Sequence, residues 1–200
     1  MIIDSAYSNE TQQIDAINAY SCRRLSIDDL ETVMRWRMSP HVTRFMNTDP
    51  VLTLDGQKQW YDRLLAIGIL YHWIIMVGTE SCGMLYLIDV DNTHKRCSWG
   101  YYIAEKRFRS FRLAVSLEMS IYDYAFLTLG LNKVVCESFC LNIVAVKLHE
   151  LCGCKTEGIL RQHICKNGQY FDICVQSMLV DEWKNARESI DYQRIDFNGP

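Results

Sequence analysis

Residues 140–158 read C-L-N-I-V-A-V-K-L-H-E-L-C-G-C-K-T-E-G, and this stretch decides the fold that the chain is expected to adopt. It follows Lys133–Phe139, an apolar and β-branched run that predicts a buried strand. Asn142 then opens an amphipathic helix, and Gly153 follows the last apolar position of that helix as a C-terminal stop. The stretch therefore predicts a strand, an Asn-capped short helix, a glycine and a new strand.

The rest of the chain alternates strand and helix patterns in the order β-α-α-β-β-β-α-β-α-β-β, which is an α+β arrangement. Asn167 and Gly168 separate the last two predicted strands and indicate a hairpin, because both residue types tolerate positive φ. We expect a loosely ordered lead-in over residues 1–20 and one domain over 21–200. The other predicted strands lie near residues 22–25, 72–77, 82–90, 98–104, 158–165 and 170–180, and the other helices begin at 26, span 54–66 and end near 129.

The composition of the 200 residues is that of an ordinary folded protein, with 49% hydrophobic residues and a formal net charge of -3. There is no basic surplus to indicate nucleic acid as a partner, and no apolar run approaches the length of a membrane span. The N-terminus lacks a signal-peptide pattern, so the nine cysteines predict reduced thiols in a cytoplasmic protein. Cys152 and Cys154 lack the four-ligand spacing of a structural metal site, and no metal is expected.

The strand–Asn–helix–Gly stretch resembles the second acyl-CoA motif of the GNAT N-acetyltransferase superfamily, roughly N-x-x-A-x-x-x-Y-x-x-x-G-F. Asn142, Ala145 and Gly153 match this motif. His149 stands where the family has Tyr, and Cys154 stands where it has Phe. The predicted element order also matches the GNAT order from about residue 23 to 180. The resemblance implies the GNAT fold, with a mostly antiparallel sheet flanked by helices, and acetyl transfer from acetyl-CoA to an amine.

A basic segment before the long helix is similar to the family's pyrophosphate loop, R/Q-x-x-G-x-G/A. Arg109 and Ala114 match the ends of that loop, whereas Arg112 stands where the central Gly is expected. The N–H groups of a helix start suit a pyrophosphate, and the Arg112 guanidinium can contact phosphate itself. A solvated basic helix start is the alternative. The expected cofactor residues here are Arg109, Ser110, Phe111, Arg112, Leu113 and Ala114.

In the family, the strand before that loop splays from its neighbour and pairs with pantetheine. Residues 99–103 occupy this place, and Gly100 within them suggests a bulge or the close approach of another backbone. Backbone N–H groups around Tyr102, Ile103 and Ala104 are the expected oxyanion donors. Asn142 resembles the family Asn that contacts the cofactor, and it also suits a helix cap.

Two side chains are the expected catalytic groups. His149 occupies the position of the family's proton-donating Tyr, and histidine can donate a proton near neutral pH. A helix histidine with no catalytic task is the alternative. Glu137, taken as an inward carboxylate on the central strand, is the candidate base, with Glu105 and Glu118 as weaker ones.

The N-terminal third is similar to the acetyltransferases of pseudaminic-acid biosynthesis, which acylate the 4-amino group of a UDP-linked deoxy sugar. Residues 34–46, M-R-W-R-M-S-P-H-V-T-R-F-M, resemble that subgroup's W/F-R-N-x-P…W-M segment. Arg37 is the expected diphosphate contact, and Trp36 and Trp60 are expected to stack on the base or sugar. Gln57 replaces a His often found there. Core packing is the alternative for both Trp residues.

Three other hypotheses stay open. The first is a resemblance to the ribosomal-protein N-terminal acetyltransferases, which bind a peptide end. The second is a domain that has lost catalysis and only binds acyl-CoA, and the third is transfer of a different acyl group. Family members often dimerise, so a homodimer is compatible with the resemblance.

Overall fold

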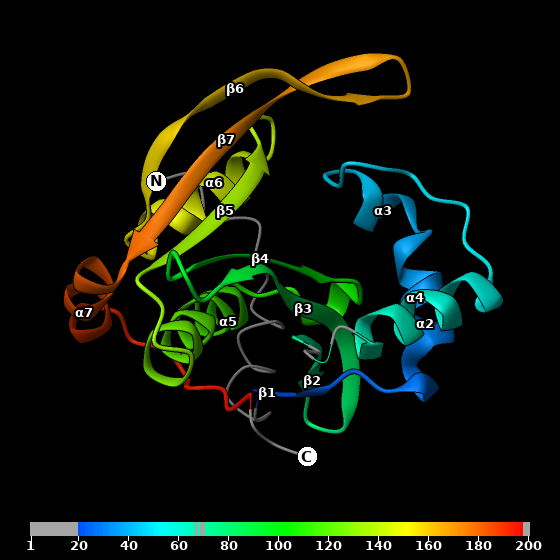
Figure 1. Ribbon diagram of the computed structural model, residues 1–200, viewed down its shortest axis with the longest axis horizontal. Helices are drawn as coiled ribbons and strands as arrows, with labels where there is room; N and C mark the ends of the chain where they lie inside the picture. Colours follow the sequence, from blue (N-terminus) through cyan, green and yellow to red (C-terminus); the bar gives the residue numbers. More distant parts are fainter. Residues whose placement is uncertain (1–19, 67, 69–70, 198–200) are drawn as a thin grey trace.

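The computed structural model describes residues 20–66, 68 and 71–197, and a seven-stranded sheet runs through these residues in the order β1-β2-β3-β4-β5-β7-β6 (Figure 1). Neighbouring strands are antiparallel except for β4 and β5, which are parallel. The expected α+β fold with a mostly antiparallel sheet is confirmed. The strands are β1 (Tyr20–Arg24), β2 (His72–Val77), β3 (Glu80–Asp91), β4 (Arg96–Ile103), β5 (Lys133–Phe139), β6 (Lys155–Lys166) and β7 (Gln169–Leu179).

Helices pack on both faces of the sheet. The long helix lies under one face, and the three N-terminal helices lie on the other side (Figure 1). Two α-helices go beyond the prediction, namely α3 and the C-terminal α7. The helices are η1 (Ile27–Asp29), α2 (Leu30–Arg37), α3 (Pro40–Thr43), α4 (Leu54–Ala66), η2 (Lys106–Phe108), α5 (Phe111–Asp123), its π-helical continuation η3 (Tyr124–Thr128), α6 (Ile143–Leu151) and α7 (Val180–Ser189).

The alternation of side chains along the strands produces a core on each face. On the α5 face, Trp73 and Leu85 are fully buried against Leu117 and its neighbours. On the α2 and α4 face, a smaller cluster forms around Ile74 and Tyr102. Most of the expected lead-in, residues 1–19, lies outside the described residues, and Tyr20 already belongs to β1.

β4 and β5 separate soon after they begin. Their ladder contains only the pairs that start at Arg96 with Lys133 and end at Ser98 with Val135. Beyond that point β4 continues along β3, and β5 continues along β7. The described strands therefore form a V between the ends of β4 and β5, as expected from the resemblance.

Two glycines occupy positions that disfavour a larger residue, one in the β6–β7 turn and one in β4. The turn between β6 and β7 has Asn167 at φ 50° and Gly168 at φ 76°, which confirms the predicted hairpin. Gly100 differs from its prediction, because β3 and β4 pair without a bulge there. A Cβ at Gly100 would lie 2.7 Å from the Tyr86 hydroxyl, so an aromatic side chain approaches rather than a backbone.

All nine cysteines are free, and seven are buried. Within the part of the chain that the structure describes, no helix is long and apolar enough to cross a membrane.

Candidate active site

The start of α5 presents backbone N–H groups beside the open end of the V. Ser110 is the N-cap, and its hydroxyl accepts the N–H of Leu113 at 3.1 Å. The N–H of Ala114 donates to the Ser110 carbonyl at 3.1 Å. Phe111 and Arg112 belong to the first turn, so their N–H groups have no acceptor within the helix. This turn has the donors and the dipole that an anion needs.

The two arginines of this segment have different environments. Arg109 donates from Nε to the Ile103 carbonyl at 2.9 Å, so it fastens the loop to the end of β4. Arg112 is exposed in the first turn of α5, with ordinary helical backbone. An arginine is therefore compatible with the backbone at the position where the family loop has Gly.

The end of β4 offers fewer oxyanion donors than expected. The N–H of Ala104 donates to the Cys82 carbonyl at 2.7 Å, so it faces β3. N–H groups alternate between the two sides of a strand, so the backbone N–H of Tyr102, two residues before Ala104, points toward β3 as well. The backbone N–H of Ile103 points into the V, on the same side as its carbonyl, which accepts the hydrogen bond from Arg109. Of these three residues, the geometry favours Ile103 as a donor.

His149 lies inside the protein, close to the point where the V opens. Asn142 caps α6 by accepting the N–H of Ala145 at 3.5 Å, and His149 is buried near the other end of this helix. His149 is 5% exposed, and its imidazole lies edge-on to Trp99 of β4, with 5.8 Å between the ring centroids. Its Nε2 is 3.5 Å from the Ser138 hydroxyl of β5. His149 thus contacts both strands of the V.

A buried carboxylate supports this histidine. Glu118 of α5 is fully buried, and its Oε1 is 2.9 Å from His149 Nδ1. The same oxygen accepts the Tyr122 hydroxyl at 2.7 Å. Burial, and then the charge of Glu118, raises the pKa of the Tyr122 hydroxyl and of the Cys152 thiol, so both stay protonated donors. The network joins α5 to α6 beneath the V.

Glu137 does not have the inward position that the sequence suggested. It is exposed, and it alternates with the buried Cys136 and Ser138 on β5. Its side chain therefore lies on the opposite face of the strand from His149. A role as base stays a prediction, and it would have to act from this open face.

Two of the residues expected to contact a nucleotide, Trp36 and Arg37, are largely covered. Trp36 is 7% exposed and donates from Nε1 to Glu105 at 3.1 Å. Arg37 is half-buried, contacts the Met46 sulfur, and its charge acts on the Tyr102 hydroxyl. Burial raises the pKa of Tyr102, so this hydroxyl stays protonated. The contact of the Arg37 side chain is therefore with another residue of the same protein, Met46.

Trp60 and Gln57 lie on α4 beside the sheet. Trp60 is half-buried and packs edge-on to His72, with 5.5 Å between the ring centroids. Gln57 is 8% exposed. His72 also stacks on Tyr86 at 5.8 Å. These contacts fit the core-packing alternative for Trp60.

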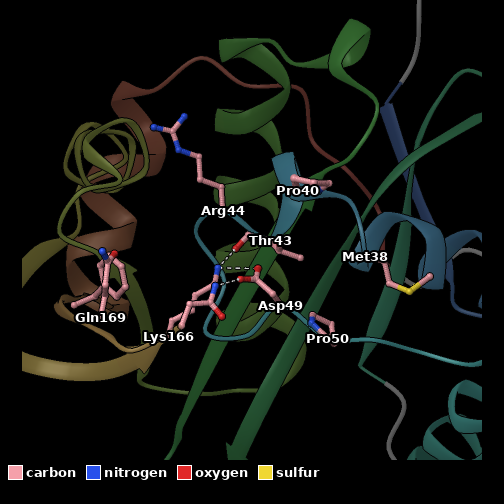
Figure 2. A pocket seen from close by; sticks show the side chains of 10 residues that line it. Met38, Pro40, Thr43, Arg44, Asp49, Pro50, Lys166 and Gln169 are labelled. Carbon is pink, nitrogen blue, oxygen red and sulfur yellow. Dashed lines mark hydrogen bonds and ion pairs between the residues drawn. The ribbon is translucent and has the colours of Figure 1, made fainter.

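The segment from α3 to α4 connects the end of β4 to the tip of the β6–β7 hairpin. At one end, His41 donates from Nε2 to the Ala104 carbonyl at 2.8 Å. At the other, Lys166 donates to the Thr43 carbonyl at 2.7 Å and pairs with Asp49 at 3.0 Å (Figure 2). The segment therefore crosses the open side of the V.

Two cavities lie beside this crossing. A cavity of about 530 Å³ lies between α3, the following loop and the hairpin tip, and Arg44 extends along it away from the Lys166–Asp49 pair (Figure 2). A neighbouring cavity of about 400 Å³ reaches Phe139 at the end of β5. The second cavity is lined by Arg44, Phe45, Phe139, Leu141 and Phe171.

Sequence reasoning missed Ser138, Arg44 and the Lys166 contact, and it ranked Glu118 low. Ser138 and Glu118 show no motif spacing, because their partner His149 is on another element. Arg44 lay inside the segment assigned to a nucleotide sugar. Alternation along β5 was the one available signal, since it places Ser138 opposite Glu137.

Comparison with solved structures supports the fold. Spermidine N-acetyltransferase from Vibrio cholerae, in a crystal structure with CoA and spermine, has a TM-score of 0.77 at 21% identity, covering 83% of this chain and 98% of that one. A putative acetyltransferase from T. thermophilus has a TM-score of 0.70 at 24% identity, covering 85% of this chain and 90% of that one.

Sequence relatives fall in the same group. SPbeta prophage-derived uncharacterized N-acetyltransferase YokL of Bacillus subtilis is 33% identical, covering 80% of this chain and 84% of YokL. Putative ribosomal N-acetyltransferase YdaF of Bacillus subtilis is 28% identical, covering 66% of this chain and 69% of YdaF. These names and the spermidine enzyme do not support the expected likeness to the pseudaminic-acid subgroup.

The family itself is settled by the match of residues 22–155 to the acetyltransferase (GNAT) domain model. The matched span runs from β1 to the start of β6, so it includes the V, the start of α5 and the α6 histidine. The chain belongs to the GNAT acetyltransferase family and is an N-acetyltransferase of that type.

Proposed function

We propose that this chain transfers the acetyl group of acetyl-CoA to the N-terminal amine of a peptide. The observation that carries the proposal is the pair of cavities beside the open side of the V, lined by Arg44, Lys166 and three phenylalanines. The relative named as a putative ribosomal N-acetyltransferase favours the same acceptor class.

The donor half follows from the strands and the start of α5. Pantetheine would be held between β4 and β5, beyond the last ladder pair at Ser98 and Val135, where backbone groups on the open side can pair with it. The N–H groups of Phe111 and Arg112 in the first turn of α5, together with the Arg112 guanidinium, would hold the pyrophosphate. The residues of the structure fit CoA in this orientation.

Arg112→Ala is expected to raise the KM for acetyl-CoA about 10-fold, because a hydrogen bond to a charged group contributes about 1.5 kcal/mol or somewhat more. Steady-state kinetics at saturating acceptor measure this. Arg161→Ala, an exposed arginine on β6, is the matched control and leaves the KM unchanged. An unchanged KM in folded Arg112→Ala protein would place the pyrophosphate elsewhere.

The charge beside the V distinguishes the acceptor classes. A polyamine carries several positive charges and needs carboxylates, but Asp49 of the larger cavity is already paired with Lys166. Arg44 adds a positive charge that repels a polycation. A peptide offers one amine and backbone carbonyls, to which a guanidinium can donate. Phe139 and Phe171, edge-on at 5.4 Å, supply an apolar surface for its first side chains.

A nucleotide amino sugar fits less well. Its diphosphate needs an accessible arginine fork. Arg37, the expected contact, is half-buried and contacts the Met46 sulfur. Arg44 is more accessible but lies next to aromatic side chains, which favours a ligand with apolar parts.

An acceptor screen tests this proposal directly. Short peptides with free N-termini, spermidine and UDP-linked amino sugars are compared at equal concentration by the release of CoA thiol. We expect kcat/KM to be highest for a peptide. A higher kcat/KM for spermidine would overturn the acceptor assignment and leave the acetyl-CoA site intact.

Arg44→Ala is expected to raise the KM for the peptide about 10-fold and to leave the KM for acetyl-CoA unchanged, since one charge-assisted hydrogen bond is lost. Arg35→Ala is the matched control, because Arg35 is a surface arginine on the outer side of α2. Equal effects of both variants would indicate a general charge effect rather than a contact.

A further inference from the structure

We propose that the Ser138 hydroxyl delivers the proton to the leaving thiolate, with His149 behind it as the proton source and Glu118 as a positioning residue. This inference rests on the proposed function, in that it takes the thioester to lie in the V between β4 and β5. It does not depend on which amine accepts the acetyl group.

His149 is enclosed on several sides. The residue is 5% exposed, and its imidazole lies edge-on to Trp99 with Glu118 at 2.9 Å from Nδ1. The ring is also shorter than the tyrosine that the resemblance places at this position. A sulfur between the strands therefore needs a group that bridges it to the imidazole.

Ser138 is that group. It belongs to β5 three residues beyond Val135, where the ladder with β4 ends, so its backbone borders the V. Its side chain faces the α5 and α6 side, as does that of Cys136. The hydroxyl lies 3.5 Å from His149 Nε2, which is long, but catalytic hydrogen bonds often tighten only when substrate is bound.

Glu118 determines which ring nitrogen of His149 is directed at Ser138. Its carboxylate accepts the Nδ1–H of His149, so Nε2 is the nitrogen directed at Ser138. The Tyr122 hydroxyl at 2.7 Å holds the same carboxylate oxygen in place. Glu118 lies behind His149 and acts through it, in the way that a carboxylate orients a catalytic histidine elsewhere.

The proton transfers balance as follows. The neutral amine attacks the thioester carbonyl carbon, so a C–N bond forms and the C–S bond breaks with its electron pair on sulfur. Ser138 gives its hydroxyl proton to that sulfur, and doubly protonated His149 returns one from Nε2. His149 ends neutral, with its Nδ1–H still on Glu118. The extra proton of the attacking amine leaves to water, and His149 takes one proton back from water at Nε2 before the next turnover, so the enzyme ends each cycle unchanged.

Ser138→Ala is expected to lower kcat about 10-fold, since a water can partly replace the hydroxyl, while the KM for acetyl-CoA stays unchanged. Ser138→Thr, which keeps a hydroxyl, recovers most of the activity. In a chain that already carries His149→Ala, adding Ser138→Ala causes no further loss, because members of one relay are not additive. Thiol release with the best acceptor of the screen, together with the melting temperature of each variant, measures this.

The outcomes are distinct. Full kcat in folded Ser138→Ala protein, or losses that multiply in the double variant, would overturn the relay. A failure of peptides as acceptors would not affect this test, since any accepted amine can be used. Failure of thiol release with every amine would contradict the proposed function itself.

Glu118→Gln tests the positioning role. We expect kcat to fall with the KM for acetyl-CoA unchanged, and no additional fall in the His149→Ala chain. A fall in kcat that persists without His149 would show that Glu118 acts otherwise and overturn its assignment.

Discussion

Replacing His149 with alanine is expected to lower kcat about 100-fold, with the KM for acetyl-CoA nearly unchanged, because one acid–base group supplies about this factor. The imidazole is the group that connects Glu118 to Ser138 in the structure. Its loss removes the internal proton source for the leaving thiolate. Thiol release under saturating substrates measures the change.

Alanine also leaves Glu118 buried without its histidine, which costs stability. His149→Gln is therefore measured beside it, since an amide can still donate to Glu118 but cannot deliver a proton. His149→Tyr, which restores the residue of the family motif, should recover much of the activity. His163→Ala removes an exposed histidine on β6 and serves as the matched control. Normal turnover of folded His149→Gln protein would assign the acid role to another group.

Acidification is expected to destabilise the protein through His72. Burial lowers the pKa of His72 to about 4, against about 6.5 in the unfolded chain. The unfolded state therefore binds the extra proton first, and the free energy of unfolding falls as the pH drops from about 6.5 to about 4. The loss at about pH 4.5 amounts to about 2.5 kcal/mol, and well above about pH 6.5 there is none.

Urea unfolding of the wild type and His72→Phe at matched pH values isolates this contribution. Phenylalanine keeps the aromatic contacts with Trp60 and Tyr86 and cannot take up a proton. Nδ1 of His72 has no hydrogen-bond partner among the described residues, so little is lost at neutral pH. The difference in pH dependence between the two proteins is the expected result. Parallel curves would mean that His72 stays solvated in the folded protein.

The elements themselves were largely predictable from local patterns. The helix Leu54–Ala66 and the strands His72–Val77 and Lys133–Phe139 end where apolar periodicity ends. Gly153 closes its helix with φ at 97°, and Asn167 and Gly168 form the expected turn. These features depend on residues a few positions apart, which a sequence displays directly.

The site was less predictable, because it depends on contacts between distant elements. Glu118 and His149 are 31 positions apart and meet only when α5 and α6 pack together. Glu137 was assigned to the wrong side because its burial was inferred from the apolar strand as a whole, whereas alternation places it with Lys133 and Val135. Gly100 suggested a backbone neighbour, and Tyr86 from the adjacent strand fills the space instead.

The position of β7 has a consequence for the order in which the enzyme matures. Although it is the last of the described strands along the chain, β7 lies between β5 and β6. β5 has only three paired residues with β4 but seven with β7. In a nascent chain that still lacks β7, β5 is therefore attached to the sheet only by its three-residue ladder with β4. Translation must pass residue 179 before the acetyl-CoA site is fully assembled, so ribosome-bound intermediates and C-terminally truncated products should be inactive even when their motifs are complete.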